Sequence, residues 1–315
     1  MFNIYQRILS AWYQKPWLFF WLLPFSLIYQ FIIFIRRFLY QHHFLKKYRA
    51  PCPVIVVGNF VVGGTGKTPM VIALAQLLMA KGYKPGIVTR GYGGSHIAEN
   101  IRVNPNSDPK IVGDEPVLMA AETNCPIVKN KNRALAAKLL ADECDIIISD
   151  DGLQHYALIS DIKIAMQPNA QYLKNAFLLP AGPWREPKNA LKNVDFVQTS
   201  TIAIDYIYAL NNKDQRFTGK HAHALCAIAA PWRFFTLLND FGIETINHAY
   251  PDHFQFSSQH LKFADDLPIL ITEKDAVKCK DFNIQNVWVV KIKTHLDPEF
   301  TKSLFNKINT LKVKS

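Results

Sequence analysis

A strand, a glycine-rich turn and a helix follow one another between residues 53 and 82, and this succession constrains the fold more than any other feature. Residues 53–57 read "PVIVV", a β-branched run typical of a buried parallel strand. Residues 68–83 predict a helix with Pro69 in its first turn and Gly82 at its end. This order predicts an α/β fold, a P-loop NTPase-like parallel sheet with helices on both faces.

The turn itself, "GGTGKT", has the residue types of a phosphate-binding loop. Glycines allow main-chain N–H groups to converge on phosphate oxygens at the positive end of a helix. Lys67 is expected to reach the β- and γ-phosphates, and the Thr68 hydroxyl to bind Mg²⁺. The spacing departs from strict G-x-x-x-x-G-K-[ST], because Val61 stands five residues before Gly66. The residues expected to bind the nucleotide are Val61, Val62, Gly63, Gly64, Thr65, Gly66, Lys67 and Thr68.

Two carboxylates follow a second apolar strand. Residues 145–149 predict a buried strand that ends in Asp150 and Asp151. In a P-loop fold, carboxylates at the carboxyl end of the strand beside the loop strand hold Mg²⁺. The alternative is a turn without a ligand, since Asp and Gly are common turn residues. The phosphate loop upstream favours the metal site.

Three further loops present polar side chains. "TRGYGG" places Arg90 and Tyr92 after another predicted strand. "VGDEP" places Asp114 just before a helix, where helix capping is the alternative to a chemical role. "PAGPWREP" presents Arg185 and Glu186 on a stiff turn, which would otherwise be a rigid linker.

The N-terminal segment from Trp17 to Ile35 is apolar except for Pro24, Ser26 and Gln30. As a helix it would measure about 30 Å, the thickness of one bilayer core. We do not expect a cleaved signal peptide, because two arginines follow and no small-residue cleavage site does. A spanning helix, an interfacial helix or helical pair broken near Pro24, and a buried core helix are the alternatives. The many Trp and Phe residues favour membrane contact, either spanning or lying flat.

The net charge of +11 indicates partners that carry negative charge, and Arg36, Arg37, Lys46, Lys47 and Arg49 stand together behind the apolar segment. This position favours anionic membrane lipid and a cytoplasmic location for the rest of the chain. No RNA-binding signature, zinc spacing or long basic run is present, so nucleic acid is not an expected partner. The five cysteines are far apart and form no C-x-x-C, which indicates free thiols in a reducing cytosol.

A second alternation of strands and helices begins near residue 224. We expect strands at 224–230, 244–250, 267–272 and 287–293, and helices at 231–242, 257–266, 273–279 and 298–312. This pattern predicts a smaller C-terminal α/β lobe, and a cleft between two lobes is a usual place for a substrate. The loop "YPDHFQFS" carries Asp252 and His253, and the histidine needs a carboxylate of the other lobe to have a role.

The expected domains are therefore three. Residues 1–45 form an N-terminal hydrophobic, membrane-associated helical segment, residues 46–220 a P-loop kinase domain with a linker, and residues 221–315 the C-terminal α/β lobe.

Eight motifs taken together resemble one family, the tetraacyldisaccharide 4′-kinases, the lipid A 4′-kinases of Gram-negative bacteria. In order they are "VGNFVVGGTGKTP", "TRGYGG", "VGDEP", "SDDGLQHY", "PAGPWREP", "WRFF", "YPDHFQF" and "ITEKDAVK". They extend from about residue 54 to residue 278, and the apolar N-terminus also fits. Members often have a glycine-containing turn before "RFF", whereas this chain has "AIAAPWRFF", a difference that concerns the local loop shape.

The resemblance implies transfer of the ATP γ-phosphate to the 4′-hydroxyl of a tetraacylated, 1-phosphorylated glucosamine disaccharide. It also implies a peripheral (monotopic) or single-pass enzyme at the cytoplasmic face of the bacterial inner membrane. The apolar segment would then hold the nucleotide site beside a lipid substrate whose acyl chains stay in the bilayer.

The resemblance also assigns residues by their motif positions. Asp114 is the implied catalytic base, His253 is its partner, and Lys67 belongs to the same catalytic group. The residues implied for Mg²⁺ are Thr68, Asp150, Asp151 and Glu186. Those implied for the substrate are Asn59, Arg90, Tyr92, Gln154, His155 and Arg185.

In the expected mechanism, Asp114 takes the proton of the attacking hydroxyl, while His253 orients it and raises its basicity through a hydrogen bond. Since the two residues come from different lobes, the pair forms fully only when the cleft closes. The competing function is a membrane-anchored P-loop ATPase of the partitioning or targeting type, without a lipid substrate. Such proteins often carry a lysine just before the paired glycines, where this chain has Val62, and they would leave Asp114 and His253 without a role.

Overall fold

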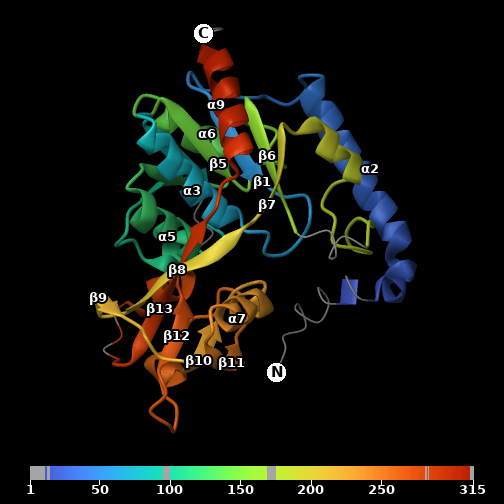
Figure 1. Cartoon of the computed structure of the whole chain (residues 1–315). Coiled ribbons are helices and arrows are strands. Elements are labelled where there is room, and N and C mark those ends of the chain that lie inside the picture. The colour runs from blue at the N-terminus through green and yellow to red at the C-terminus, as the bar shows by residue number, and fades with distance from the viewer. Residues whose placement is uncertain are drawn as a thin grey trace.

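The chain forms two α/β lobes, with a long N-terminal helix along one side of the first (Figure 1). The computed structural model describes residues 11–12, 15–94, 100–168, 175–280, 282 and 284–312. Much of the expected N-terminal segment is included, while its residues 1–10 and 13–14 lie outside the described part.

The first lobe is built on a seven-stranded sheet of order β3-β4-β2-β5-β1-β6-β7. Its strands are β1 (Val54–Gly58), β2 (Pro85–Thr89), β3 (Ile101–Val103), β4 (Ile127–Lys129), β5 (Ile146–Asp150), β6 (Ile162–Gln167) and β7 (Phe196–Thr199). All neighbours are parallel except β3 and β4. The loop strand β1 lies directly beside β5, with Val57 opposite Asp150, as the sequence predicts.

Helices cover both faces of this sheet, which confirms the predicted fold class. They are α3 (Lys67–Ala80), α4 (Pro109–Val112), α5 (Asp114–Thr123), α6 (Arg133–Leu140), α9 (Pro298–Lys312) and the 3₁₀ helix η3 (Lys188–Asn193). Successive residues of β1 point to opposite faces. Ile55 and Val57 belong to the core formed with α3, α5 and α9, whereas Val54 and Val56 belong to the core formed with α6.

The turn between β1 and α3 requires glycine at position 66. Gly66 has a φ of +81°, a conformation that side chains with a Cβ rarely adopt. A Cβ at this position would also lie 2.3 Å from the Oγ atom of Ser200, which follows β7. Helix α3 ends close to Gly82, with a φ of +84°, where the sequence predicts its end.

The second lobe has a six-stranded sheet of order β11-β10-β12-β13-β8-β9. Its strands are β8 (Ile202–Ala209), β9 (Asn212–Arg216), β10 (His221–Cys226), β11 (Glu244–Ala249), β12 (Ile269–Thr272) and β13 (Val287–Thr294). Its helices are α7 (Pro231–Asp240), α8 (Glu273–Cys279) and the 3₁₀ helix η4 (Ser258–Leu261). The four strands expected from alternation pair in parallel, and η4 is shorter than the helix expected at 257–266.

The structure divides the chain differently from the expected boundary at residue 220. Strands β8 and β9, which precede that boundary, pair in antiparallel fashion with β13 and with each other. Helix α9 returns to the first lobe, where Phe300, Leu304 and Ile308 pack in the core of the first sheet. The chain therefore crosses between the lobes twice, once between β7 and β8 and once between β13 and α9. The two crossing segments are bonded to each other, because the backbone N–H of His295 donates to the carbonyl of Thr201 over 2.9 Å.

The apolar N-terminal segment forms the 3₁₀ helix η1 (Pro16–Leu22) and the α-helix α2 (Leu23–Gln41), with the change of helix type beside Pro24. Ser26 is the only buried residue of α2. Its exposed apolar side chains include Phe25, Leu27, Ile28, Phe31, Ile32, Phe34, Ile35 and Phe38. The buried core helix considered above is thus wrong. Among the described residues, Trp17–Gln41 is the one helical segment long and apolar enough to cross a membrane, with a mean hydropathy of 2.2.

Candidate active site

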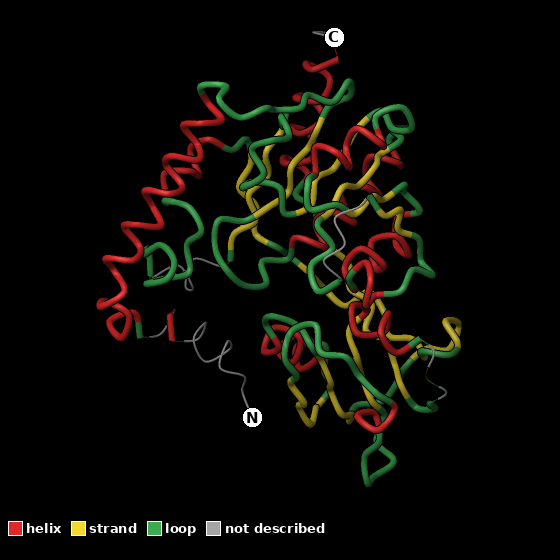
Figure 2. The backbone as a smooth tube through the Cα atoms, turned by 180° about the vertical axis from the view of Figure 1, so that it is seen from behind, coloured by secondary structure: helices red, strands yellow, loops and turns green. Residues whose placement is uncertain are grey.

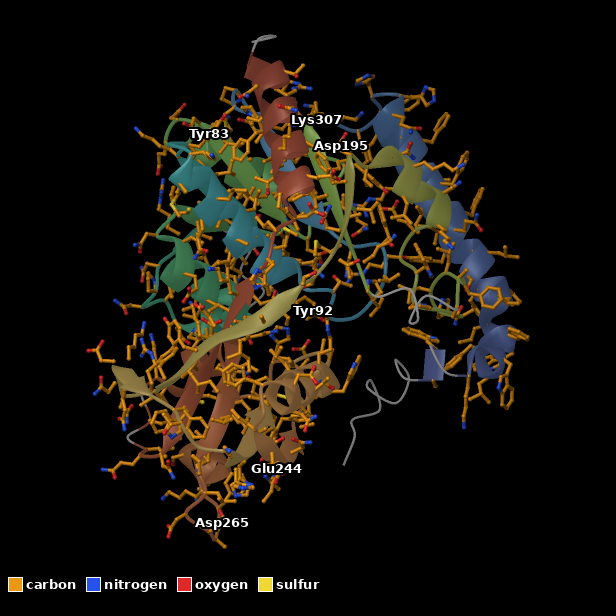
Figure 3. The ribbon with its side chains drawn as sticks, viewed as in Figure 1. Tyr83, Tyr92, Asp195, Glu244, Asp265 and Lys307 are labelled. Atoms are coloured by element: carbon orange, nitrogen blue, oxygen red, sulfur yellow. The ribbon has the colours of Figure 1, made fainter. Side chains whose placement is uncertain are left out.

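Both lobes line a cavity of about 710 Å³ that lies where β1, β2 and β5 end. The first lobe contributes Val62, Gly63, Gly64, Thr65, Gly66, Lys67, Thr68, Arg90, Tyr92, Glu115, Asp150, Asp151 and Arg185. The second lobe contributes Arg233, Asp252, His253 and Lys274 among others. Figure 3 shows Tyr92 at the junction of the two lobes. The carboxyl ends of parallel strands are the usual ligand site of such sheets, as the sequence predicts.

Asn59 and Gln154, which the resemblance implied for substrate binding, form hydrogen bonds that support the phosphate loop. The Asn59 side-chain amide donates to the Thr65 hydroxyl over 3.0 Å, and the Gln154 amide donates to the Asn59 carbonyl over 3.0 Å. Neither lines the cavity. Val61 does not line it either, because its side chain is buried and its backbone pairs with Trp184.

The second lobe also contacts the phosphate loop, through a residue not predicted to have a role. The Arg233 guanidinium on α7 donates to the carbonyl of Gly64 over 2.9 Å. Arg233 belongs to the motif "WRFF", but the sequence alone does not show that α7 lies over the phosphate loop, so it did not predict this contact.

At the carboxyl end of β5, two adjacent carboxylates have opposite environments. Lys67 lies 3.7 Å from Asp151, and Arg185 lies 3.2 Å from it. Burial raises the pKa of Asp151, but these two cations outweigh burial and hold that pKa below its ordinary value. For Asp150, burial and the charges of Glu115 and Asp151 raise the pKa far above the usual range of a carboxyl group.

The surroundings of Asp150 fit a cation shared with phosphate oxygens. Its Oδ2 accepts a hydrogen bond from Thr89 over 2.9 Å, while its buried Oδ1 has no hydrogen-bond partner among the described residues. No three His, Cys, Asp or Glu side chains in that part of the chain form a metal site on their own. Mg²⁺ commonly takes one or two carboxylates and completes its shell with water and substrate phosphates. Glu115 also lines the cavity, and its charge acts on Asp150, which the sequence did not predict.

Asp114 and His253 come from different lobes and are in direct contact. Asp114 is the first residue of α5, and His253 follows β11 in a loop. The imidazole Nδ1 lies 2.9 Å from Oδ1 and 3.1 Å from Oδ2 of the carboxylate. His253 lines the cavity, while Asp114 is buried behind it with 3 % exposure. The lone loop histidine thus has the carboxylate partner that its role requires.

The electrostatics of this pair correct one expectation. Burial is the largest single influence and lowers the pKa of His253, but the hydrogen bond to Asp114 and the charges of Asp114 and Asp252 together raise it overall. Burial raises the pKa of Asp114, but the hydrogen bond from His253 and the charge of Lys274 lower it overall. Both shifts favour an ion pair. The expected increase in the basicity of Asp114 is therefore wrong, because a cationic neighbour stabilises the charged carboxylate.

The pair predicts a pH-dependent contribution to stability. Because the pKa of His253 is raised above 6.5, its contribution is complete below pH 6.5 and is lost as the pH rises through the raised value. Because the pKa of Asp114 lies below 3.8, its contribution persists down to about that pH. We expect His253→Asn to lower the Tm by roughly 2–4 °C between about pH 4 and 6.5, and by less at pH 9.

Thermal unfolding of the two proteins across this pH range measures the difference. Asparagine suits this site because His253 has a φ of +61°, a conformation that asparagine tolerates. The exposed His42, changed to Asn, is the matched control. A Tm difference that stays constant from pH 5 to 9 would contradict the ion pair.

Lys274, at the start of α8, links carboxylates of both lobes. Its Nζ lies 3.0 Å from Glu115, 3.1 Å from Asp252 and 4.0 Å from Asp114. Burial alone would lower the pKa of this amine, but the three carboxylates raise it, so Lys274 is charged. The sequence showed a lysine in the first turn of a predicted helix and gave no sign of these partners.

Two other predicted site residues lie away from the cavity. Glu186 is buried and accepts a hydrogen bond from Tyr156 over 2.8 Å, so the structure does not bring it to Asp150. His155 is partly buried, and its Nε2 has no hydrogen-bond partner among the described residues. Burial, then the charges of Arg133, Arg36 and Arg90, lower the pKa of His155 to about 4. This histidine is therefore neutral at pH 7.

Comparison with known proteins identifies the family. The profile of the tetraacyldisaccharide-1-P 4′-kinase family matches residues 18–309. A tetraacyldisaccharide 4′-kinase of Hahella chejuensis is 38 % identical over 332 residues, which cover 96 % of this chain and 98 % of the relative. That of Actinobacillus succinogenes is 40 % identical over 321 residues and covers 96 % and 98 %.

A solved structure shares the fold. The crystal structure of LpxK from Aquifex aeolicus in complex with ATP superposes with a TM-score of 0.78 at 28 % identity, and the match covers 92 % of this chain and 99 % of that one. The resemblance inferred from the eight motifs is confirmed. The chain belongs to the tetraacyldisaccharide-1-P 4′-kinase family.

Proposed function

We propose that the cavity between the lobes is the place where a lipid disaccharide receives the γ-phosphate of ATP on its 4′-hydroxyl. As a member of its family, the chain is an ATP-dependent tetraacyldisaccharide 4′-kinase of lipid A biosynthesis. The observation that carries the proposal for the cavity is the contact of 2.9 Å between Asp114 and His253, which joins the lobes beside the phosphate loop. Membership in this family also removes the competing ATPase without a lipid substrate.

ATP would place its β- and γ-phosphates against the N–H groups of residues 63–68, with the ammonium of Lys67 beside them. The relative from Aquifex aeolicus was solved with ATP, which supports this placement. Thr68, Asp150 and Asp151 would hold Mg²⁺, and its charge would offset the charge that develops on the transferring phosphate. We do not include Glu186 among the Mg²⁺ ligands, because its side chain contacts Tyr156 and Arg37 instead of the cavity.

The attacking hydroxyl needs a proton acceptor, and the Asp114–His253 pair supplies it. Asp114 is the base proposed from the motif, and the imidazole is the end of the pair that lines the cavity. When His253 is neutral, the proton of the 4′-hydroxyl would pass to this pair as the hydroxyl oxygen bonds to the γ-phosphorus, while the bond from that phosphorus to the β,γ-bridging oxygen breaks and ADP leaves. Since each lobe carries one member, the pair is complete only when the lobes are together, which limits ATP hydrolysis without substrate.

The exposed apolar side of α2 would hold the enzyme on the cytoplasmic face of the inner membrane. Its exposed Phe, Ile and Leu side chains form an apolar surface of the kind that binds a membrane. Lys46 and Lys47, just beyond the helix, are placed to attract anionic headgroups, each by about 1 kcal/mol. The lipid substrate would then reach the cavity without leaving the bilayer.

A transfer assay tests both parts of the proposal. The full chain is incubated with ATP labelled at the γ-phosphate and with tetraacyldisaccharide 1-phosphate in vesicles. We expect label in the lipid, and faster labelling with anionic than with zwitterionic vesicles at low salt. ATP turnover without labelled lipid would contradict the kinase. If the rate of labelling did not change with salt or with anionic lipid, the electrostatic attachment to the membrane would be contradicted, but the kinase activity would not.

A further inference from the structure

Helix α2 has one side that faces the protein, and polar residues on that side carry its contacts. The polar Ser26, Tyr29 and Arg37, together with the apolar Ile33, follow one another at intervals of three or four residues, which is one stripe of an α-helix. They are less exposed than the residues between them. Because these residues are turned toward the protein, their polar groups need partners within it.

Two hydroxyls of this stripe bond to the main chain of residues 178–186, the loop that carries "REP". The Ser26 hydroxyl donates to the carbonyl of Leu178 over 2.9 Å and accepts from the N–H of Ala181 over 3.1 Å. The Tyr29 hydroxyl donates to the carbonyl of Arg185 over 3.1 Å. Figures 1 and 2 both show loop segments between α2 and the first sheet.

The third contact of the stripe is an ion pair. The Arg37 guanidinium lies 3.2 Å from Oε2 of Glu186, whose side chain is 2 % exposed. Tyr156 bonds to the other oxygen, whereas Oε2 accepts no hydrogen bond of good geometry among the described residues. A buried carboxylate needs a counter-charge, and Arg37 supplies it at this oxygen. Burial raises the pKa of Glu186, and the hydrogen bond from Tyr156 and the charge of Arg37 act against that rise more strongly than the charge of Arg36 does.

The other side of the same loop is bonded to the phosphate loop. The N–H of Arg185 donates to the carbonyl of Phe60 over 2.7 Å, and the N–H of Val62 donates to the carbonyl of Pro183 over 2.8 Å. The Arg185 side chain then reaches Asp151, 3.2 Å away at the edge of the cavity. Residues 178–186 therefore lie between the membrane helix and the nucleotide site, with hydrogen bonds to both.

We propose that α2 positions the phosphate loop through residues 178–186, and that Arg37 is the positioning residue on which this coupling depends. The inference rests on the proposed function in one respect, namely that the cavity binds ATP. Loss of Arg37 leaves the Glu186 carboxylate buried without its counter-charge, so the loop must shift to rehydrate it. A displacement of the phosphate loop by even about 1 Å lengthens its hydrogen bonds to a triphosphate and lowers the affinity for ATP.

The test is ATP binding to the full chain in detergent, measured by calorimetry, with Arg37→Met as the variant and Arg36→Met as its control. Arg36 is adjacent and exposed, and lies over the Tyr156 ring at 5.5 Å. We expect Arg37→Met to weaken ATP binding by about tenfold and Arg36→Met by less than twofold. Both variants should bind anionic vesicles equally, since each removes one charge.

Two further variants separate positioning from misfolding. Arg37→Lys should recover most of the ATP affinity, because the charge is restored. Combining Arg37→Met with Glu186→Gln should bind ATP more tightly than Arg37→Met alone, because no buried charge remains unpaired. A double variant no better than the single one, or Arg37→Met with unchanged ATP affinity, overturns the coupling. If the protein without substitutions did not bind ATP, that result would contradict the proposed function rather than the coupling.

Discussion

Replacing Asp114 by alanine is expected to lower kinase turnover by about a hundredfold or more while ATP binds nearly as before. The carboxylate is the hydrogen-bond partner of His253, and neither group contacts the phosphate loop in the contacts described above. Without it, the imidazole loses its orientation and the attacking hydroxyl loses its proton acceptor. Initial rates of lipid phosphorylation at saturating ATP measure the loss, and calorimetry measures ATP affinity.

Asp142→Ala is the matched control, since Asp142 is an exposed carboxylate outside the cavity. Asp114 also lies 3.8 Å from the buried ammonium of Lys278, so thermal unfolding must show that the variant is folded. Asp114→Asn keeps the shape of the side chain and should show a similar loss. Turnover within about threefold of the unchanged protein in both Asp114 variants would exclude this residue as the base or its essential partner.

Replacing Lys67 by alanine should damage ATP binding and turnover together, with kcat/KM lower by roughly 10²–10³-fold. The ammonium lies at the start of α3, 3.7 Å from Asp151, at the point where the phosphates would lie. It would contact the triphosphate in the ground state and the developing charge in the transition state. This predicts a higher KM for ATP as well as a lower kcat, unlike the Asp114 variants.

The exposed Lys302 on α9, changed to alanine, controls for the loss of one positive charge. Steady-state rates over a range of ATP concentrations separate kcat from KM. Asp151 keeps Arg185 as a partner in the Lys67 variant, so the site should remain folded. Unchanged ATP kinetics would place the phosphates away from Lys67 and would contradict the proposed nucleotide position.

Much of the local structure follows from short-range patterns. The run "PVIVV" is a buried strand and the helix after the loop ends beside Gly82, because side-chain branching and glycine act on backbone angles within a few residues. The pattern of alternating elements also located α7, β12, α8 and β13 within a few residues. It failed for β8 and β9, because β8 pairs with β13, about 80 positions away in the chain, and β9 pairs with β8.

The site was only partly predictable, for a similar reason. The phosphate loop and the adjacent aspartates are contiguous in the chain and have recognisable spacing. The partnership of Asp114 with His253 came from family resemblance, since 139 positions separate them. Lys274 and Arg233 were not predicted, because a single cation in a helix shows nothing of the carboxylate or carbonyl that lies opposite.

Glu186 shows the limit most clearly. Its motif suggested the metal site, yet its side chain points to Arg37 and Tyr156. Arg185 and Glu186 are adjacent in one turn, but their side chains have partners in different places: Arg185 contacts Asp151 at the cavity, and Glu186 contacts Arg37 on helix α2. Direction of this kind depends on the surrounding packing rather than on neighbouring residues in the chain.

The order of residues therefore specified a phosphate loop between a buried strand and a helix, and an apolar segment ahead of it, because each rests on backbone preferences and hydrophobicity over short stretches. Only the packed structure decided which charged groups meet: Asp114 with His253, Lys274 with Glu115, and Arg37 with Glu186. Such pairs join distant segments. Their existence depends on how sheets and helices stack, and burial then makes each pair strong enough to shape the site.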